Sequence, residues 1–267
     1  MKIRTIASST FGSFLYNKVV LVVCIPVVGF FLIGLFMVIE FKRMTTGGNL
    51  ELGQVQLIQT LGQNLSVLIN LGTLLAVWAA ADSVAGEMKS GTILAVMARP
   101  LQRWQFLVGK YIGVLMLMLI FVVGTIGATW FLMRLGSLPS HTSWWILFVY
   151  PLVRYSVWAS IAIFLVNFMP PLAVLGVSAT LSTTIWFFTQ EYAINNIPAW
   201  IVQTVHLVLP LTTVVLSEDR FFSMTEAALK RYAWVDHATA LAYGVDYALV
   251  FFLLAIAVFQ RRSLTRD

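Results

Sequence analysis

Six long apolar stretches constrain most strongly what this chain of 267 residues can fold into. Each has about the 20 residues that an α-helix needs to cross the hydrocarbon core of a bilayer, and none shows the alternation of a membrane β-strand. The sequence therefore predicts an all-α membrane protein with six transmembrane helices in a single transmembrane domain, residues 1–267. The stretches are Val19–Ile39, Val55–Ala81, Phe106–Met133, Trp144–Asn167, Leu172–Thr189 and Ala240–Phe259.

Composition excludes several classes of protein. Charged residues make up 10% of the chain and hydrophobic residues 60%, whereas about a quarter of a soluble domain is charged. One cysteine and three scattered histidines exclude a disulfide scaffold and a Cys/His metal cluster, so no metal site is expected. The net charge of +6 would suggest nucleic acid in a soluble protein, but here its distribution along the chain matters more, and no nucleic-acid partner is expected.

The basic residues orient the predicted helices. With the N-terminus inside, the inner side has ten Lys and Arg residues and three acidic residues. The outer side then has six Lys and Arg residues and seven acidic residues. Lys and Arg in short loops stay on the cytoplasmic side, so both termini are expected there. Arg103 and Lys110 are interpreted mainly as anchors at the membrane surface.

Two further segments are expected to lie along the membrane surface. Residues 1–18 place apolar side chains on one stripe of a helix, which predicts an interfacial helix on the inner leaflet. Residues 190–239 include the apolar stretch Ile197–Leu216, which is interrupted by Pro210. A seventh crossing there would move one basic terminus outside, so a re-entrant or interfacial outer segment is favoured over a seventh span.

Residues 82–105 form the predicted cytoplasmic elbow between the second and third helices. Asp82 or Ser83 can cap a short helix, Ser90-Gly91 offers a break, and Pro100 prevents the same helix from continuing. The elbow contains Gly86-Glu87 and Gly91-Thr92-Ile93, followed by P-L-x-R-x-Q-F-L-x-G-K-x-x-G from Pro100 to Gly113. This order and spacing resemble the signature of ABC-2 type permeases, the membrane subunits of ATP-driven transporters.

The resemblance implies a half-transporter in a bacterial cytoplasmic (inner) membrane, most often an exporter. It also implies a second copy of the chain as a homodimer partner, besides membrane lipid, and two copies of a separate ATPase that meets the elbow. The elbow residues that the resemblance assigns to ATPase coupling are Glu87, Lys89, Ser90, Gly91, Thr92, Arg99, Pro100 and Arg103.

The chain itself carries no recognisable ATP site. A P-loop needs G-x-x-x-x-G-K-[ST], and Gly109-Lys110 lacks the earlier glycine and is followed by Tyr111. No cofactor is therefore expected on this chain, and ATP and Mg²⁺ belong to the partner ATPase. Gly109 and Gly113 instead form a small-xxx-small pair typical of close helix packing. No set of catalytic residues is expected, so the chain is not predicted to be an enzyme.

Arg154 and Asp246 are charges inside predicted membrane helices. Arg154 lies ten residues into the fourth stretch, about 15 Å from its outer end and near the middle of the hydrocarbon. A lipid-facing charge at that depth costs at least about 2.5–3.5 kcal/mol, so a pair with Asp246 is expected, as a salt bridge or as a substrate contact. Two other functional classes stay open: an ion-coupled carrier that uses this pair, and a non-transporting membrane scaffold.

Overall fold

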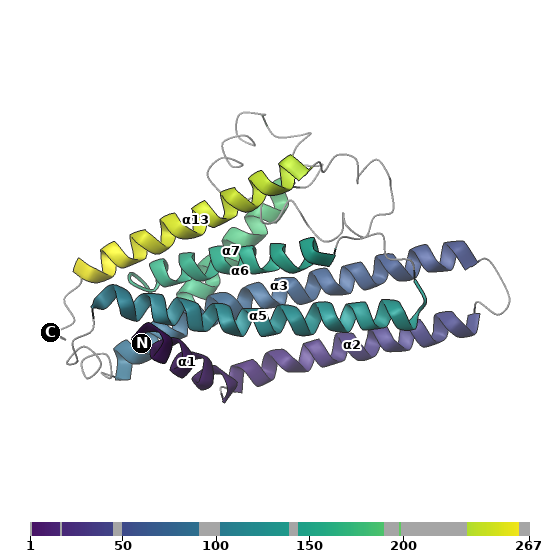
Figure 1. The fold of residues 1–267 in the computed structure, drawn as a ribbon, viewed down its shortest axis with the longest axis horizontal. Helices are drawn as coiled ribbons and strands as arrows, with labels where there is room; N and C mark the ends of the chain where they lie inside the picture. The colour runs from purple at the N-terminus through teal and green to yellow at the C-terminus, as the bar shows by residue number, and fades with distance from the viewer. Residues whose placement is uncertain are drawn as a thin grey trace.

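The computed structural model is a bundle of long helices (Figure 1). It describes residues 2–16, 18–44, 50–90, 102–138, 144–189, 198 and 234–261, and contains no strand within them. A continuous helix satisfies its own backbone hydrogen bonds, which a bilayer core requires. The helices are α1 (Lys2–Leu15), α2 (Lys18–Met44), α3 (Leu50–Ser90), α5 (Arg103–Leu135), α6 (Trp144–Leu165), α7 (Pro171–Thr189) and α13 (Trp234–Arg261).

Five of the helices, namely α2, α3, α5, α6 and α13, are long and apolar enough to cross a membrane. They match five of the six predicted stretches, so the chain is a multi-pass membrane protein. The remaining stretch corresponds to α7, whose 19 residues give a length of about 28 Å. Its described part qualifies only as a shorter apolar helix, and a sixth crossing stays a prediction.

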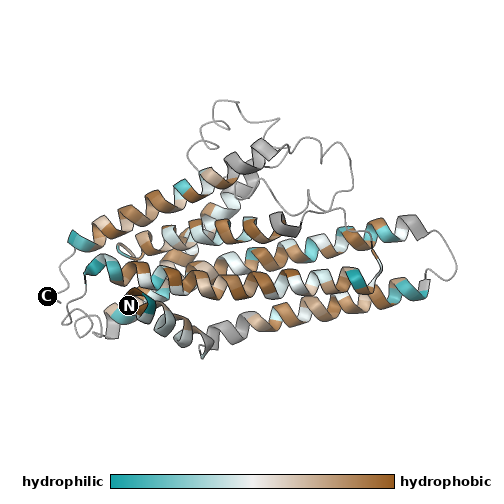
Figure 2. Ribbon diagram, viewed as in Figure 1, coloured by the Kyte–Doolittle hydropathy of each residue, from teal (hydrophilic) through white to brown (hydrophobic). Residues whose placement is uncertain are grey.

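One end of the bundle gathers four chain segments that lie far apart in the sequence. The start of α1, the end of α3, the start of α5 and the end of α13 all lie at the left in Figure 1. Figure 2 shows hydrophilic residues near the helix ends and a hydrophobic band between them. The two ends of the described chain therefore lie on the same side of that band.

The helix α3 is longer than expected. Its 41 residues span about 60 Å, twice the thickness of a hydrocarbon core, and it continues without a break from the predicted second span to Ser90. The expected cap at Asp82 or Ser83 is wrong, because both residues lie inside α3 and the Ser83 hydroxyl donates to the carbonyl of Ala80 at 2.9 Å. The first part of the predicted elbow is thus a helical extension of a membrane span.

The helices α3 and α6 form the most buried layer, whereas α2 and α13 are the most exposed. The largest fully buried side chains include Trp158 and Tyr155 of α6 and Phe106 of α5. Gly72 of α3 makes a close approach possible, because a Cβ there would lie 2.2 Å from the Tyr155 hydroxyl. That hydroxyl donates instead to the carbonyl of Ile69 at 3.1 Å and joins α6 to α3.

Parts of two predicted segments lie outside the described residues. Residues 91–101 of the elbow are one, and most of the outer segment 190–239 is the other. Residues 234–239, which the sequence analysis assigned to that outer segment, are the first turns of α13. The last helix therefore begins six residues before the predicted Ala240.

Candidate functional site

The first three turns of α5, residues 103–113, connect the elbow to most of the bundle. They carry most of the described part of the sequence signature and contact α1, α3, α6 and α13. We call residues 103–113 the α5 hub.

Two glycines of the α5 hub let α1 pack directly on it. A Cβ at Gly109 would lie 2.7 Å from the side chain of Ile6, and one at Gly113 would lie 3.0 Å from the carbonyl oxygen of Ala7. The expectation of close helix packing from this small-xxx-small pair is confirmed. The apolar stripe of α1 therefore lies against protein, with Phe14 buried and its ring 6.4 Å from that of Trp78 in α3.

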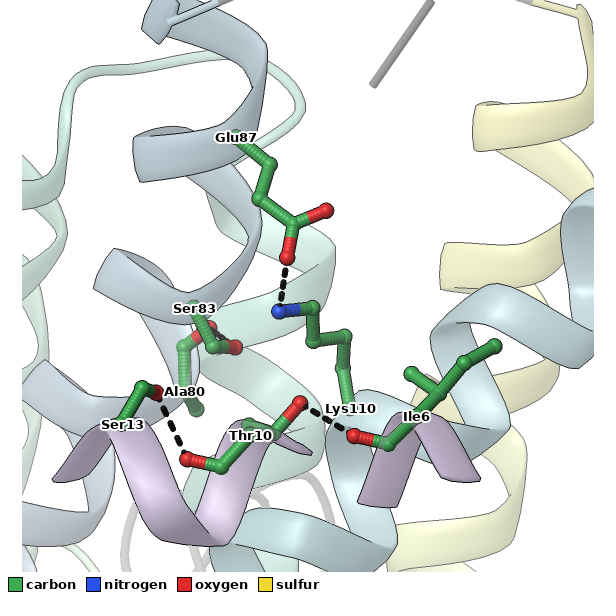
Figure 3. A network of polar contacts seen from close by, with 7 residues as sticks. All are labelled: Ile6, Thr10, Ser13, Ala80, Ser83, Glu87 and Lys110. Atoms are coloured by element: carbon green, nitrogen blue, oxygen red, sulfur yellow. Dashed lines mark hydrogen bonds and ion pairs between the residues drawn. The ribbon is translucent and has the colours of Figure 1, made fainter. Parts of the chain in front are cut away.

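An ion pair joins the end of α3 to the α5 hub. The Lys110 ammonium donates to a carboxylate oxygen of Glu87, directly above the polar side chains of α1 (Figure 3). The Lys110 side chain is 6% exposed and that of Glu87 is 28% exposed. Lys110 is thus a buried partner in an interhelical pair, and the expectation that it anchors the protein at the membrane surface is wrong.

The hub also holds the end of α13. The Lys110 ammonium lies 5.6 Å from the centre of the Phe106 ring, and that ring stacks on Phe259 with centroids 6.0 Å apart. The Arg103 guanidinium donates to the carbonyl of Gln260 at 2.9 Å. The start of α5 and the end of α13 are therefore joined by direct contacts.

Tyr111 connects the hub to the centre of the bundle. Its hydroxyl lies 2.7 Å from the Ser156 hydroxyl of α6, and it donates to the Ser156 carbonyl at 3.1 Å. Its ring stacks on Phe252 of α13 at 4.6 Å. Tyr111 is not among the site residues predicted from the sequence, although its place within the signature was an available signal.

The structure places only part of the predicted coupling set. Glu87 and Arg103 are described and lie at the same end of the bundle. Lys89 and Ser90 belong to the last turn of α3, but their side chains lie outside the described residues. The same holds for the whole of Gly91, Thr92, Arg99 and Pro100.

A second polar site lies deeper, around Arg154. This residue is 6% exposed, and its guanidinium donates to the amide oxygen of Asn70 in α3 at 2.5 Å. Asp246 lies on the exposed side of α13 among Val245 and Leu249. The expected ion pair between Arg154 and Asp246 is not formed among the described residues, because Arg154 is directed toward α3 and finds an amide there.

A pocket of about 400 Å³ adjoins Arg154 between α3, α6 and α7. Asn70 and Thr73 line it from α3, and Ser178 and Ser182 line it from α7. The protein thus combines a largely apolar pocket that contains a buried arginine with a contact hub at one end of the same helices.

Comparison with known proteins agrees with this architecture. The sequence profile described as ABC-2 family transporter protein matches residues 4–264, nearly the whole chain. The search of curated proteins gave no match. Because the match covers nearly the whole chain, the chain belongs to the family of ABC-2 transporter proteins.

Proposed function

We propose that this protein is the membrane subunit of an ATP-driven exporter and works with a separate ABC ATPase. In the proposed complex, two copies of the chain form a homodimer and two copies of the ATPase bind its cytoplasmic side. ATP and Mg²⁺ bind to the ATPase, and the permease moves substrate by alternating access. The complex lies in a bacterial inner membrane, with six crossings and both termini in the cytoplasm.

The α5 hub is the observation that best supports this proposal. An ATPase can drive transport only if its motion at the membrane surface reaches the helices that hold the substrate. The hub overlaps the end of the predicted elbow and contacts α1 through glycines, α3 through an ion pair, α6 through Tyr111 and α13 through Phe106. It thus offers a short path from the elbow into four other helices.

Site-specific crosslinking tests the proposed role of the elbow. The permease is expressed together with the proteins encoded next to it in its genome. Cys24 is replaced, and the cysteine introduced by Thr92→Cys is labelled with a photoreactive maleimide. The label should crosslink to a copurifying ATPase. A matched label at Ser137→Cys, an exposed position just beyond the opposite end of α5, should not. Equal crosslinking from both positions, or purification without any ATPase, would contradict the proposal.

A further inference from the structure

The pocket between α3, α6 and α7 contains a positive charge, that of Arg154, which has no acidic partner among the described residues. Twelve residues line it, and among them Arg154 alone is ionisable. Within the described part of the chain, the guanidinium donates one hydrogen bond to Asn70, an uncharged amide. A guanidinium has five N–H donors and stays charged in proteins, so most of its capacity for binding an anion is unused here.

Other donors of the pocket also lack partners. The indole N–H of Trp158 and the hydroxyl of Ser178 are buried and form no hydrogen bond with the described residues, and neither does Nε of Arg154. All three residues line the same pocket and are less than a tenth exposed. Buried polar groups are normally paired, and leaving one unpaired is costly, so three in one pocket indicate a missing acceptor.

Two other hydroxyls of the pocket already have hydrogen-bond partners. The hydroxyls of Thr73 and Thr183 already donate to carbonyls of their own helices, at 3.1 Å and 2.9 Å. Of the buried donors in the pocket, Nε–H of Arg154, the indole N–H of Trp158 and the hydroxyl of Ser178 are therefore left without a partner among the described residues. All three are donors, and a ligand with negatively charged oxygen atoms is the kind of acceptor that matches them.

The rest of the lining is apolar and opens to the side of the bundle. Val67 and Leu74 of α3 line the pocket and are each 42% exposed. A volume of about 400 Å³ has room for a carboxylate or phosphate together with several methylene groups. This combination fits an amphiphile better than a small hydrated anion, whose water shell would be lost among apolar side chains.

We propose that this pocket binds an acidic group carried on an apolar body, either a single-chain carboxylate or the headgroup of an acidic phospholipid. This assignment rests on the proposed transport function and names the class of its substrate. The three unpaired polar atoms are covered in the present structure. Binding therefore requires side chains to rotate, with the acidic group replacing the amide of Asn70, an exposed residue, as the partner of Arg154.

Fluorescence quenching by brominated ligands tests the proposal on the copurified complex in phosphatidylcholine nanodiscs. The signal of Trp158 is the difference between the wild-type protein and Trp158→Phe. Dibromostearate or brominated phosphatidylglycerol should quench this signal, whereas brominated phosphatidylcholine should not. Quenching by dibromostearate alone identifies the ligand as a single-chain acid. Quenching by brominated phosphatidylglycerol identifies the ligand as an acidic phospholipid.

Variants separate specific binding from general effects. Arg154→Gln should weaken binding about tenfold or more, because it removes a charge-assisted contact. Ser178→Ala removes one hydroxyl and no charge, and it should weaken binding severalfold. Arg134→Gln removes an exposed arginine that stacks on Trp130 of α5, away from the pocket, and should leave binding unchanged.

Three results would overturn the proposal. They are equal quenching by phosphatidylcholine, affinity that is the same in Arg154→Gln, and displacement by inorganic phosphate as effective as by stearate. Copurification of the ATPase is measured in the same samples. If the ATPase is present and acidic amphiphiles do not bind, the assignment of the pocket fails while the proposed function stands.

Discussion

Glu87 and Lys110 should contribute to stability as a strongly coupled pair, because neither side chain is largely exposed to water. The two side chains differ in burial, so the two single substitutions should differ in their cost. Removing one partner of a fully buried pair costs about 3–5 kcal/mol. Glu87→Leu leaves the Lys110 ammonium, whose side chain is 6% exposed, without this carboxylate, so a loss of about 3 kcal/mol is expected. Lys110→Met leaves Glu87, which is 28% exposed and partly hydrated, so the loss should be nearer about 1–2 kcal/mol.

The double variant should be nearly as stable as the wild type, since hydrophobic replacement of a whole buried pair is often neutral. The free energy of unfolding is measured by denaturant titration of the purified protein in detergent, for the wild type, both single variants and the double variant. The expected coupling energy is at least about 2 kcal/mol. Single losses that add to within about 0.5 kcal/mol would refute the reasoning.

The pair between Arg43 and Glu40 on α2 provides the matched control. Its atoms are 2.9 Å apart, but the side chains are 73% and 33% exposed. An exposed pair three residues apart on one helix is worth only a few tenths of a kcal/mol. The same cycle applied there should therefore give a coupling energy below about 0.5 kcal/mol.

Two further predictions concern packing and topology. Gly113→Ala should lower stability by about 1–2 kcal/mol, because its Cβ would lie 3.0 Å from a carbonyl oxygen of α1, whereas Gly124→Ala, with open space around its Cβ, should raise stability by up to about 1 kcal/mol in the same unfolding titration. In a background without Cys24, cysteines at Ser217 or Thr225 should react with an impermeant thiol reagent from outside intact cells. Labelling only after permeabilisation would contradict the outer placement of residues 190–239.

The membrane explains why the spans could be predicted from the sequence and their ends could not. A bilayer forces long apolar segments into helices, so α2, α5 and α6 match their predicted stretches closely. Beyond the hydrocarbon this constraint ends. Residues 81–90 contain no proline, and a serine such as Ser83 can cap a helix or bond within one, as it does here. The sequence therefore did not predict how far α3 extends.

The α5 hub was predicted in part. The spacing of Gly109 and Gly113 places both on one helix face, and this local signal was enough to predict close packing. The role of Lys110 depends instead on Glu87, which lies 23 residues earlier on another helix. A lysine near the end of a membrane span is usually an anchor, and only the packing of α3 against α5 turns it into a buried partner.

Arg154 shows a different limit of sequence reasoning. A search for an opposite charge selected Asp246, because a charged side chain inside a membrane helix needs compensation. An uncharged group can supply part of this compensation, as the amide oxygen of Asn70 does at 2.5 Å. Asn70 and Thr73 lie one turn apart in α3, and Ser178 and Ser182 lie one turn apart in α7. Polar residues spaced by one turn in two apolar helices were thus the better signal for the surroundings of Arg154, since such spacing places them on a single face of each helix.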